Sequence, residues 1–311
     1  MKKNFLNHSA RILVAAAVLT FGLTSCDNKN KDVSLPPIGG YNTSDDVAKD
    51  NLKAYWSFDG TLNESKSNSA PTTNSKNSFT AGIKGQALKL DSGYILYPVI
   101  SSLGTANWGS ITVSTWINTE NQGQGSVPTG VFSLGLGNGK QTDWNDSPIF
   151  QMLENGRPKT YNDTLVLKST FASYPGGVKL GGDNINDFGA RGVDFKTVLG
   201  ANKWVHFVTR YDGTGSFIDI FANGVLVSNN KFRFRPVGGT TTGIGPVVLP
   251  ASVGLQPLIG GFANVKTGFP ASPAQTWQGL YRGSIDQVRL YNKALSDAEI
   301  KALFDLETAG R

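Results

Sequence analysis

Cysteine and histidine are almost absent from this chain. The single cysteine among 311 residues is Cys26, so no disulfide bond can form within the chain. Only two histidines are present, and one of them, His8, lies in the N-terminal stretch considered below. A lone His206 without a cysteine beside it supplies neither a Cys and His zinc site nor a Cys–His nucleophile pair. We therefore expect the fold to be held by its hydrophobic core or by a metal.

The apolar stretch near the N-terminus lacks the length of a membrane span. It covers residues 12–23, follows three basic residues, and has the length of the apolar part of a signal peptide. It ends in Leu23-Thr24-Ser25-Cys26, which resembles a bacterial lipobox. We expect residues 1–25 to be a signal peptide and Cys26 to be the lipidated residue. An ordinary secretion signal followed by an accidental cysteine is the alternative.

Positive and negative charges are nearly balanced once residues 1–25 are removed. The formal net charge falls from +6 to +3, because residues 1–25 hold three basic residues and no acidic ones. This balance gives no argument for nucleic-acid binding. Residues 26–50 are rich in Asn, Lys, Asp, Ser, Gly and Pro and have no apolar period. We expect this segment to be a flexible tether that starts at the lipidated cysteine.

Helical periodicity is nearly absent from residues 51–311, whereas short alternating runs recur between turn residues. Residues 111–117 alternate in the manner of a strand. Asn223-Gly224 separates two apolar runs and predicts a tight hairpin, because both turn positions need a positive φ. Ser296 and Glu299 form a capping box at the start of the one clear helix signal. The pattern predicts a single all-β domain with a short C-terminal helix packed outside a sandwich.

Two long segments interrupt this pattern. Residues 119–202 are rich in Gly, Asn, Asp and Pro, and residues 236–279 are rich in Gly and Pro. We expect both to be insertions in the domain, as long loops or as strands added to the sandwich. Long loops of a compact domain are often where function lies.

Four segments carry a resemblance to a known family. Residues 54–60 read Ala-Tyr-Trp-Ser-Phe-Asp-Gly, and residues 283–291 read Gly-Ser-Ile-Asp-Gln-Val-Arg-Leu-Tyr. Between them lie Lys-Trp-Val-His-Phe-Val-Thr at 203–209 and Ile-Asp-Ile-Phe-Ala-Asn-Gly at 218–224. In this order and spacing they resemble the laminin-G-like branch of the concanavalin A-like jelly rolls. The resemblance implies a jelly-roll β-sandwich, a fold used mostly to bind glycans, although a fold alone does not fix a function.

The resemblance also implies a calcium site where the first and last strands lie side by side. It places Asp59, Asn63 and Asp286 near that position, and Ca²⁺ binds carboxylate, amide and carbonyl oxygens. Glu64 departs from the family, in which Asp is common at this position. A structural Ca²⁺ would pin the termini of a sandwich without disulfides. In the alternative interpretation Asp59 caps a turn and Asp286 is an acid at a strand edge.

Aromatic residues in loop-like contexts are the candidates for glycan binding. Sugars stack their C–H faces on aromatic rings while polar side chains bind their hydroxyl groups. Trp144 is the strongest candidate, because Asp143 and Asn145 flank it. The alternative for each aromatic residue is that it anchors its own loop. The full set of predicted carbohydrate-binding residues is Trp144, Asp143, Asn145, Tyr161, Tyr174 and Trp277.

Glutamate is scarce, which bears on catalysis. The retaining glucanases of this fold carry their acids as Glu-x-Asp-x-x-Glu or Glu-x-Asp-x-Glu, and none of the five glutamates has that spacing. Asp143 and Asp146 are the pair of acids that is left to consider for glycoside hydrolysis, which uses two carboxylates about 5–9.5 Å apart. We therefore expect no enzymatic activity. A glycoside hydrolase or polysaccharide lyase is the less favoured alternative.

Together these features predict a non-catalytic carbohydrate-binding lipoprotein of the bacterial cell envelope. By resemblance it would serve glycan capture or polysaccharide utilisation of the Bacteroidetes type, at the outer membrane. Its partners would be an oligo- or polysaccharide and, through the lipid on Cys26, the membrane. A structural or adhesive lipoprotein that binds an envelope protein through the same loops is the alternative, and the sequence does not choose between the two.

Overall fold

The computed structural model describes residues 35–104, 108–121, 127–155, 162–186, 194–250 and 253–311. The chain divides into residues 1–35 and a compact unit that extends from Pro36 to Arg311. Cys26 and Tyr161 lie outside the described residues.

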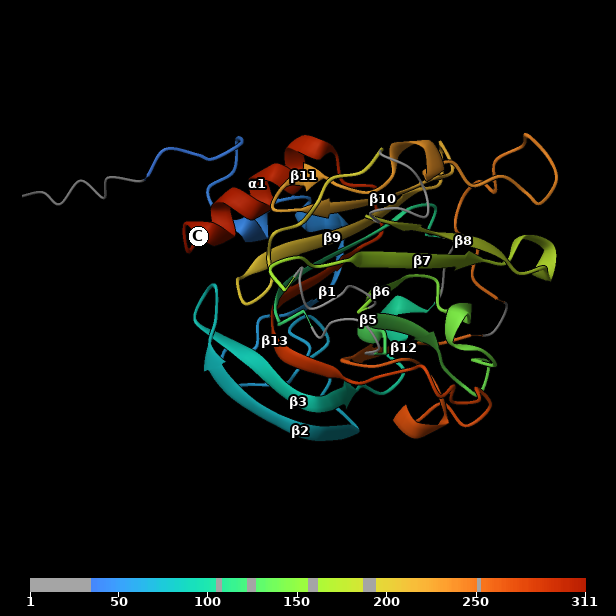
Figure 1. Cartoon of the computed structure of the whole chain (residues 1–311), viewed down its shortest axis with the longest axis horizontal. Helices are drawn as coiled ribbons and strands as arrows, with labels where there is room; N and C mark the ends of the chain where they lie inside the picture. Colours follow the sequence, from blue (N-terminus) through green and yellow to red (C-terminus); the bar gives the residue numbers. More distant parts are fainter. Residues whose placement is uncertain (1–34, 105–107, 122–126, 156–161, 187–193, 251–252) are drawn as a thin grey trace, which may run out of the picture. The chain divides into compact units, whose positions relative to one another are not determined.

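The first half of one long antiparallel sheet forms one layer of a sandwich (Figure 1). Its strand order is β11-β10-β9-β4-β13-β3, while β1 pairs with β13 and β2 pairs with β3 at the side of this path. The bounds are β1 Leu52–Trp56, β2 Thr73–Ala81, β3 Gln86–Leu96, β4 Ile111–Asn118, β9 Val205–Asp212, β10 Phe217–Ala222, β11 Val225–Leu226 and β13 Tyr281–Tyr291.

The second half of the sheet forms the other layer. Strand β3 joins the halves, because its first part pairs with β13 and its last residues, Ile95 and Leu96, pair with β12. From there the order is β12-β5-β6-β7-β8, and β7 and β8 return to contact β9 and β10. The all-β jelly-roll-like fold expected from the sequence is confirmed. The bounds are β5 Thr129–Leu136, β6 Phe150–Leu153, β7 Leu167–Ser173, β8 Leu180–Ile185 and β12 Leu255–Ile259.

The main core lies between the two layers. The alternation expected in β4 is confirmed, because Ile111, Val113 and Ile117 belong to this core. Thr115 shares their face and donates to the side-chain oxygen of the fully buried Gln151 in β6 at 2.6 Å. Gln151 also donates to carbonyl groups of β4 and β9, so the layers are joined by hydrogen bonds as well as by apolar contact.

Helix α1 (Asp297–Thr308) covers the outer face of the first layer beside β9, β10 and β11 (Figure 1). The capping box is confirmed: Glu299 N–H donates to the Ser296 hydroxyl, and Glu299 Oε2 accepts from Ser296 N–H. The hairpin at Asn223-Gly224 is confirmed by a positive φ at both residues. The short 3₁₀ turns are η1 Ser44–Asp46, η2 Lys49–Asn51, η3 Ser101–Leu103, η4 Trp144–Asp146, η6 Pro175–Gly177, η7 Asn230–Phe232 and η8 Val265–Thr267.

The folded unit begins earlier than the sequence predicts. Residues 36–50 were expected to belong to the tether, but Ser44 and Val47 are fully buried against α1 and its neighbours. Arg311, the last residue, donates to the carbonyl groups of Pro36 and Asn42 at 2.9 and 3.0 Å. The polar composition concealed this packing, because only a few of these side chains are buried.

The two segments expected to be insertions supply most of the second layer. Strands β5, β6, β7 and β8 lie within residues 119–202, and β12 lies within residues 236–279. The structure thus shows added strands and not only long loops, and these strands form one of the two layers of the sandwich. Their strands are short and separated by long Gly-rich connections, which hides the alternation in the sequence.

Candidate functional site

Trp144 lies in a cluster of aromatic rings on the outer side of the second layer. Its ring centroid is 5.3 Å from that of Trp277 and 5.6 Å from that of Phe262, and the planes meet at 84° and 74°. Phe262 and Trp277 are also perpendicular, at 89° and 5.3 Å, and Phe150 of β6 completes the cluster. Trp277 is 36% exposed, so part of this aromatic corner faces solvent.

Two acidic residues build the turn that carries Trp144. Asn145 N–H donates to Asp143 Oδ1 at 3.1 Å, and Asp143 N–H donates to Asp146 Oδ2 at 2.8 Å. This reciprocal pattern is a capping box on η4, and the backbone and hydroxyl of Thr142 add two further hydrogen bonds to Asp146. Asp143 and Asp146 are therefore occupied in holding a turn.

Two side chains from the connection between β7 and β8 brace the same turn. Lys179 donates to Asp146 Oδ1 at 2.5 Å and also contacts the Asn145 side-chain oxygen. The hydroxyl of Tyr174 donates to the Asp146 carbonyl at 2.8 Å. Burial alone would raise the pKa of Asp146, but the hydrogen bonds from Lys179 and Thr142 outweigh it and lower this pKa. A lowered pKa keeps Asp146 ionised, the opposite of what a general acid requires.

A groove of about 460 Å³ opens beside Trp144. It combines an aromatic side chain at η4 with charged and hydroxyl groups from β7 and β8, the combination that sugars require. Its lining residues are Trp144, Asn145, Lys168, Thr170, Phe171, Lys179, Leu180, Gly181, Gly182 and Asp183.

The structure brings most of the predicted carbohydrate-binding residues together. Trp144 and Asn145 line the groove, Trp277 packs on Trp144, and Asp143 and Tyr174 hold the turn from behind. The sequence reasoning missed the charged residues of β7 and β8 that complete the lining. The signal for them would have been the alternation in residues 167–173, where the side chains of Lys168 and Thr170 share one face.

Two of the three expected calcium residues, Asp59 and Asp286, hold a hairpin turn of the first layer. Asp286 is fully buried in β13, and its Oδ2 accepts from the N–H groups of Ile83 and Lys84 at 2.9 and 3.3 Å. Asp59 Oδ1 accepts from Gln86 N–H at 2.7 Å. The turn that supplies these donors joins β2 to β3 and contains Gly82 and Gly85. A Cβ at Gly82 would lie 2.4 Å from Asp286 Oδ2, and one at Gly85 would lie 2.0 Å from Asp59 Oδ1, so both positions require glycine.

The donor set at this turn does not form a ready calcium cage. Ca²⁺ needs several convergent oxygen atoms, but the oxygens of Asp286 already accept backbone N–H groups. The Asn63 side chain donates to Asn68, and Glu64 accepts from the backbone N–H groups of Tyr55, Lys66 and Ser67. Within the described residues no three acidic or histidine side chains form a group that could hold a metal. Calcium binding therefore stays a prediction.

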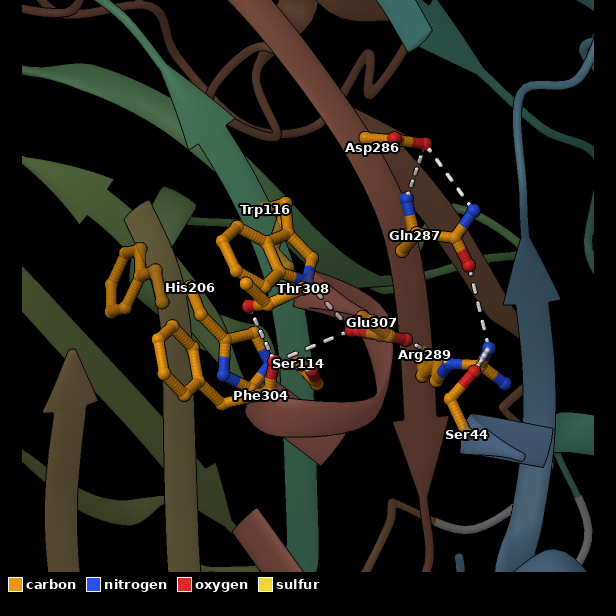
Figure 2. Close-up of polar contacts among 12 residues, drawn as sticks. Ser44, Ser114, Trp116, His206, Asp286, Gln287, Arg289, Phe304, Glu307 and Thr308 are labelled. Atoms are coloured by element: carbon orange, nitrogen blue, oxygen red, sulfur yellow. Dashed lines mark hydrogen bonds and ion pairs between the residues drawn. The ribbon is translucent and has the colours of Figure 1, made fainter. Parts of the chain in front are cut away.

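A buried polar cluster under α1 contains serine, histidine and glutamate (Figure 2). His206 Nε2 lies 2.7 Å from Ser114 Oγ and 4.0 Å from Glu307 Oε2. In a catalytic triad the acid instead binds the other ring nitrogen. Here that nitrogen, Nδ1, is buried and has no hydrogen-bond partner within the described part of the chain. Burial together with the nearby Arg289 lowers the pKa of His206 to about 3. Because all three side chains are fully buried, this cluster is structural.

Comparison with protein families identifies one match, and comparison with curated proteins finds none. The model of the concanavalin A-like lectin/glucanases superfamily matches residues 90–301. The match includes β4 to β13 and parts of β3 and α1, and it leaves out β1 and β2. Among the described residues, no helix has the length and apolar character needed to cross a membrane.

Several solved structures have a similar fold. Domain 4 of AbnA, a GH43 extracellular arabinanase from Geobacillus stearothermophilus, in complex with arabinotriose, has a TM-score of 0.47 and 18% identity, over 81% of this chain and 98% of that one. The ligand-binding domain of botulinum neurotoxin serotype D, in complex with N-acetylneuraminic acid, has a TM-score of 0.49 and 12% identity, over 84% and 52%. The binding domain of Paraclostridial Mosquitocidal Protein 1 has a TM-score of 0.47 and 14% identity, over 82% and 52%. This chain spans about half the length of the two toxin domains, and the likenesses concern the fold alone.

Proposed function

This chain belongs to the concanavalin A-like lectin/glucanases superfamily, and from this premise we propose that it binds carbohydrate without catalysing a reaction. The binding site is the groove beside Trp144. The observation that carries the proposal is the position of Trp144, which joins an aromatic corner on one side to a polar groove on the other. A pyranose ring can stack on the indole while its hydroxyl groups contact Asn145 and the charged residues of β7 and β8.

The rigidity of η4 supports this function. A binding site loses less conformational entropy on binding when its aromatic group is already fixed. The turn that carries Trp144 is fixed by the Asp143–Asp146 capping box, by Lys179 and by Tyr174, and Trp144 packs on Phe150, Phe262 and Trp277. The indole is therefore presented in one orientation.

The role of the acids near the groove supports binding without hydrolysis. Asp143 caps a turn, and Asp146 is paired with Lys179 and has a lowered pKa. A glycoside hydrolase needs one carboxyl group that is protonated at working pH and a second one across the scissile bond. Asp143 and Asp146, which hold the η4 turn, do not supply the protonated carboxyl group.

The same proposal places the domain at the bacterial cell envelope. Cys26 would carry a lipid that holds the protein at the outer membrane, within a glycan-capture or polysaccharide-utilisation system of the Bacteroidetes type. The support is the lipobox-like sequence that ends at Cys26. Mass spectrometry of the protein from its native membrane tests this point, because a lipidated N-terminal Cys26 is the expected species and an unmodified or differently cleaved N-terminus would contradict it.

The test of binding is a glycan array with residues 27–311, followed by affinity measurements on the Trp144→Ala variant. We expect a specific hit and an affinity loss of about tenfold or more on removal of the indole, because stacking on one aromatic ring is worth about 0.5–1.5 kcal/mol beyond the buried area. Phe79→Ala is the matched control, because Phe79 is also an exposed aromatic residue but lies in β2. A blank array with folded protein would contradict the proposal and favour the adhesive alternative.

A further inference from the structure

Among the described residues, each cation at the groove is paired with an acid of the same chain. Lys179 lies 2.5 Å from Asp146, and Lys168 lies 2.9 Å from Glu154 and 3.6 Å from Asp183. Arg235 borders the groove at Gly182 and lies 3.9 Å from the other oxygen of Asp183. Counted over the described residues that line or border the groove, three cations face three carboxylates, so their formal charges cancel.

This compensation restricts the ligand. A glycan carboxylate or sulfate would have to displace one of these ion pairs and would meet the acid that it displaced. Sugar hydroxyl groups can instead donate to a carboxylate and accept from an ammonium group while the pair stays intact. We propose that the groove selects neutral glycans and reads their hydroxyl groups with the Lys168–Asp183 pair; this inference rests on the proposed carbohydrate binding.

Thr170 provides a second, independent observation. It lies two residues after Lys168 in β7, so both side chains are on the groove side of the strand, while Ser169 points inward to Thr209. The Thr170 hydroxyl is buried and has no hydrogen-bond partner among the described residues. An unpaired buried hydroxyl is unfavourable, so a ligand hydroxyl that pairs with it gains affinity. The structure assigns Thr170 as a contact for a sugar hydroxyl.

The charge argument is tested with two oligosaccharides of equal length, one neutral and one in which a uronic acid replaces a neutral sugar. The neutral oligosaccharide is chosen from the glycans that bind on the array. We expect wild-type protein to bind the neutral form at least about tenfold more tightly, with little dependence on salt. Glu154→Gln removes one of the three carboxylates and gives the groove a net positive charge. The ratio of the affinities for the neutral and the acidic oligosaccharide should therefore fall at least about threefold at low salt.

Asp305→Asn is the control for this variant. It removes one negative charge from the exposed Lys301–Asp305 pair of α1, on the outer face of the other layer, and should leave the preference unchanged. A wild-type preference for the acidic sugar, or an equal effect of both variants, would overturn the neutral-glycan inference while leaving carbohydrate binding in place. A protein that binds no glycan would overturn the proposed function itself.

Thr170→Val tests the hydroxyl contact, because valine keeps the shape of threonine and removes only its hydroxyl group. If the hydroxyl binds ligand, affinity falls about two- to tenfold while the melting temperature stays the same or rises. A loss of affinity without a loss of thermal stability separates a ligand contact from a structural role. Unchanged affinity, or a lower melting temperature in the unliganded protein, would overturn the assignment of Thr170.

Discussion

Asp286 is a buried carboxylate that faces backbone N–H groups of the β2–β3 turn. Burial is the main cause of the rise of its pKa from 3.8 to about 7; three backbone N–H donors oppose the rise, and the nearby Asp59 adds to it. Asp286 is therefore protonated in the folded chain at pH values where it is ionised in the unfolded chain.

The stability of the domain should depend on pH through this residue. Between pH 4 and 7 the folded state holds a proton that the unfolded state has lost, so the free energy of unfolding falls as pH rises across this range. Thermal unfolding of wild-type protein and Asp286→Asn at pH 4.5, 6 and 8 measures the effect. We expect the difference in melting temperature between the two to shift in favour of the variant as pH increases. A difference that does not change with pH would contradict the raised pKa.

The same titration tests calcium. An ion held by the Asp59 and Asp286 carboxylates requires both to be ionised, so its stabilising effect should be present at pH 8 and absent at pH 4.5. EDTA would then lower the melting temperature at pH 8. A melting temperature that neither Ca²⁺ nor EDTA moves would remove the calcium site that the family resemblance implies.

At the scale of elements, α1 is fixed to the first layer by a buried ion pair as well as by apolar contacts. Arg289 of β13 donates to Glu307 Oε1 at 2.8 Å, and the indole N–H of Trp116 donates to Glu307 Oε2 at 2.6 Å. Figure 2 shows Glu307 between these two residues. Arg289 also reaches Ser44, so one guanidinium group links the last helix, the last strand and the N-terminal segment.

Glu307→Gln should therefore be strongly destabilising. It leaves the guanidinium group of Arg289 buried without its main counter-charge, which costs about 3–5 kcal/mol of unfolding free energy. Chemical denaturation measures this loss. Asp305→Asn on the same helix breaks only an exposed pair and should cost less than about 0.5 kcal/mol. Equal effects of the two variants would contradict the structural role assigned to the buried pair.

At the scale of the whole molecule, the N-terminal segment closes the fold against the C-terminus. Asp45 lies 2.8 Å from Arg289, Ser44 N–H donates to the Arg311 carbonyl, and Val47 packs into the cluster under α1. Figure 1 shows the start of this unit beside α1. The turn η4 instead contacts β5 and β7 of the second layer. A chain held by its N-terminus would be attached on the α1 side, and the groove is on the other layer.

A chain that begins at residue 51 should therefore be less stable than one that begins at residue 36. The shorter chain loses the buried Val47 and the Asp45 partner of Arg289, and we expect its unfolding free energy to be lower by about 2 kcal/mol or more. Denaturant titration of both chains gives the difference. Equal midpoints would mean that residues 36–50 act as a tether after all.

The sequence by itself determined the features that depend on neighbouring residues. The alternation in β4, the Asn223-Gly224 hairpin and the Ser296–Glu299 capping box are local patterns, and each appears in the structure as expected. Together with the family motifs they were enough to predict an all-β sandwich with a C-terminal helix. Trp144 was predicted as a binding residue from its local surroundings, because its polar neighbours are adjacent in the chain; the structure places it beside a groove, and its contact with a sugar stays a prediction.

Only the tertiary structure decided the features that join residues far apart in the chain. The packing of Trp277 on Trp144, the hydrogen bond between Thr115 and Gln151 and the hydrogen bond from Arg289 to Ser44 each depend on how distant segments are arranged in the fold. Within residues 119–202 and 236–279 the alternation is confined to short runs such as 167–173, and long Gly-rich connections separate these runs, so the strands were not predicted one by one. Burial and ion pairing are set by contacts across the sheet, and these contacts exist only once the two layers have closed on each other.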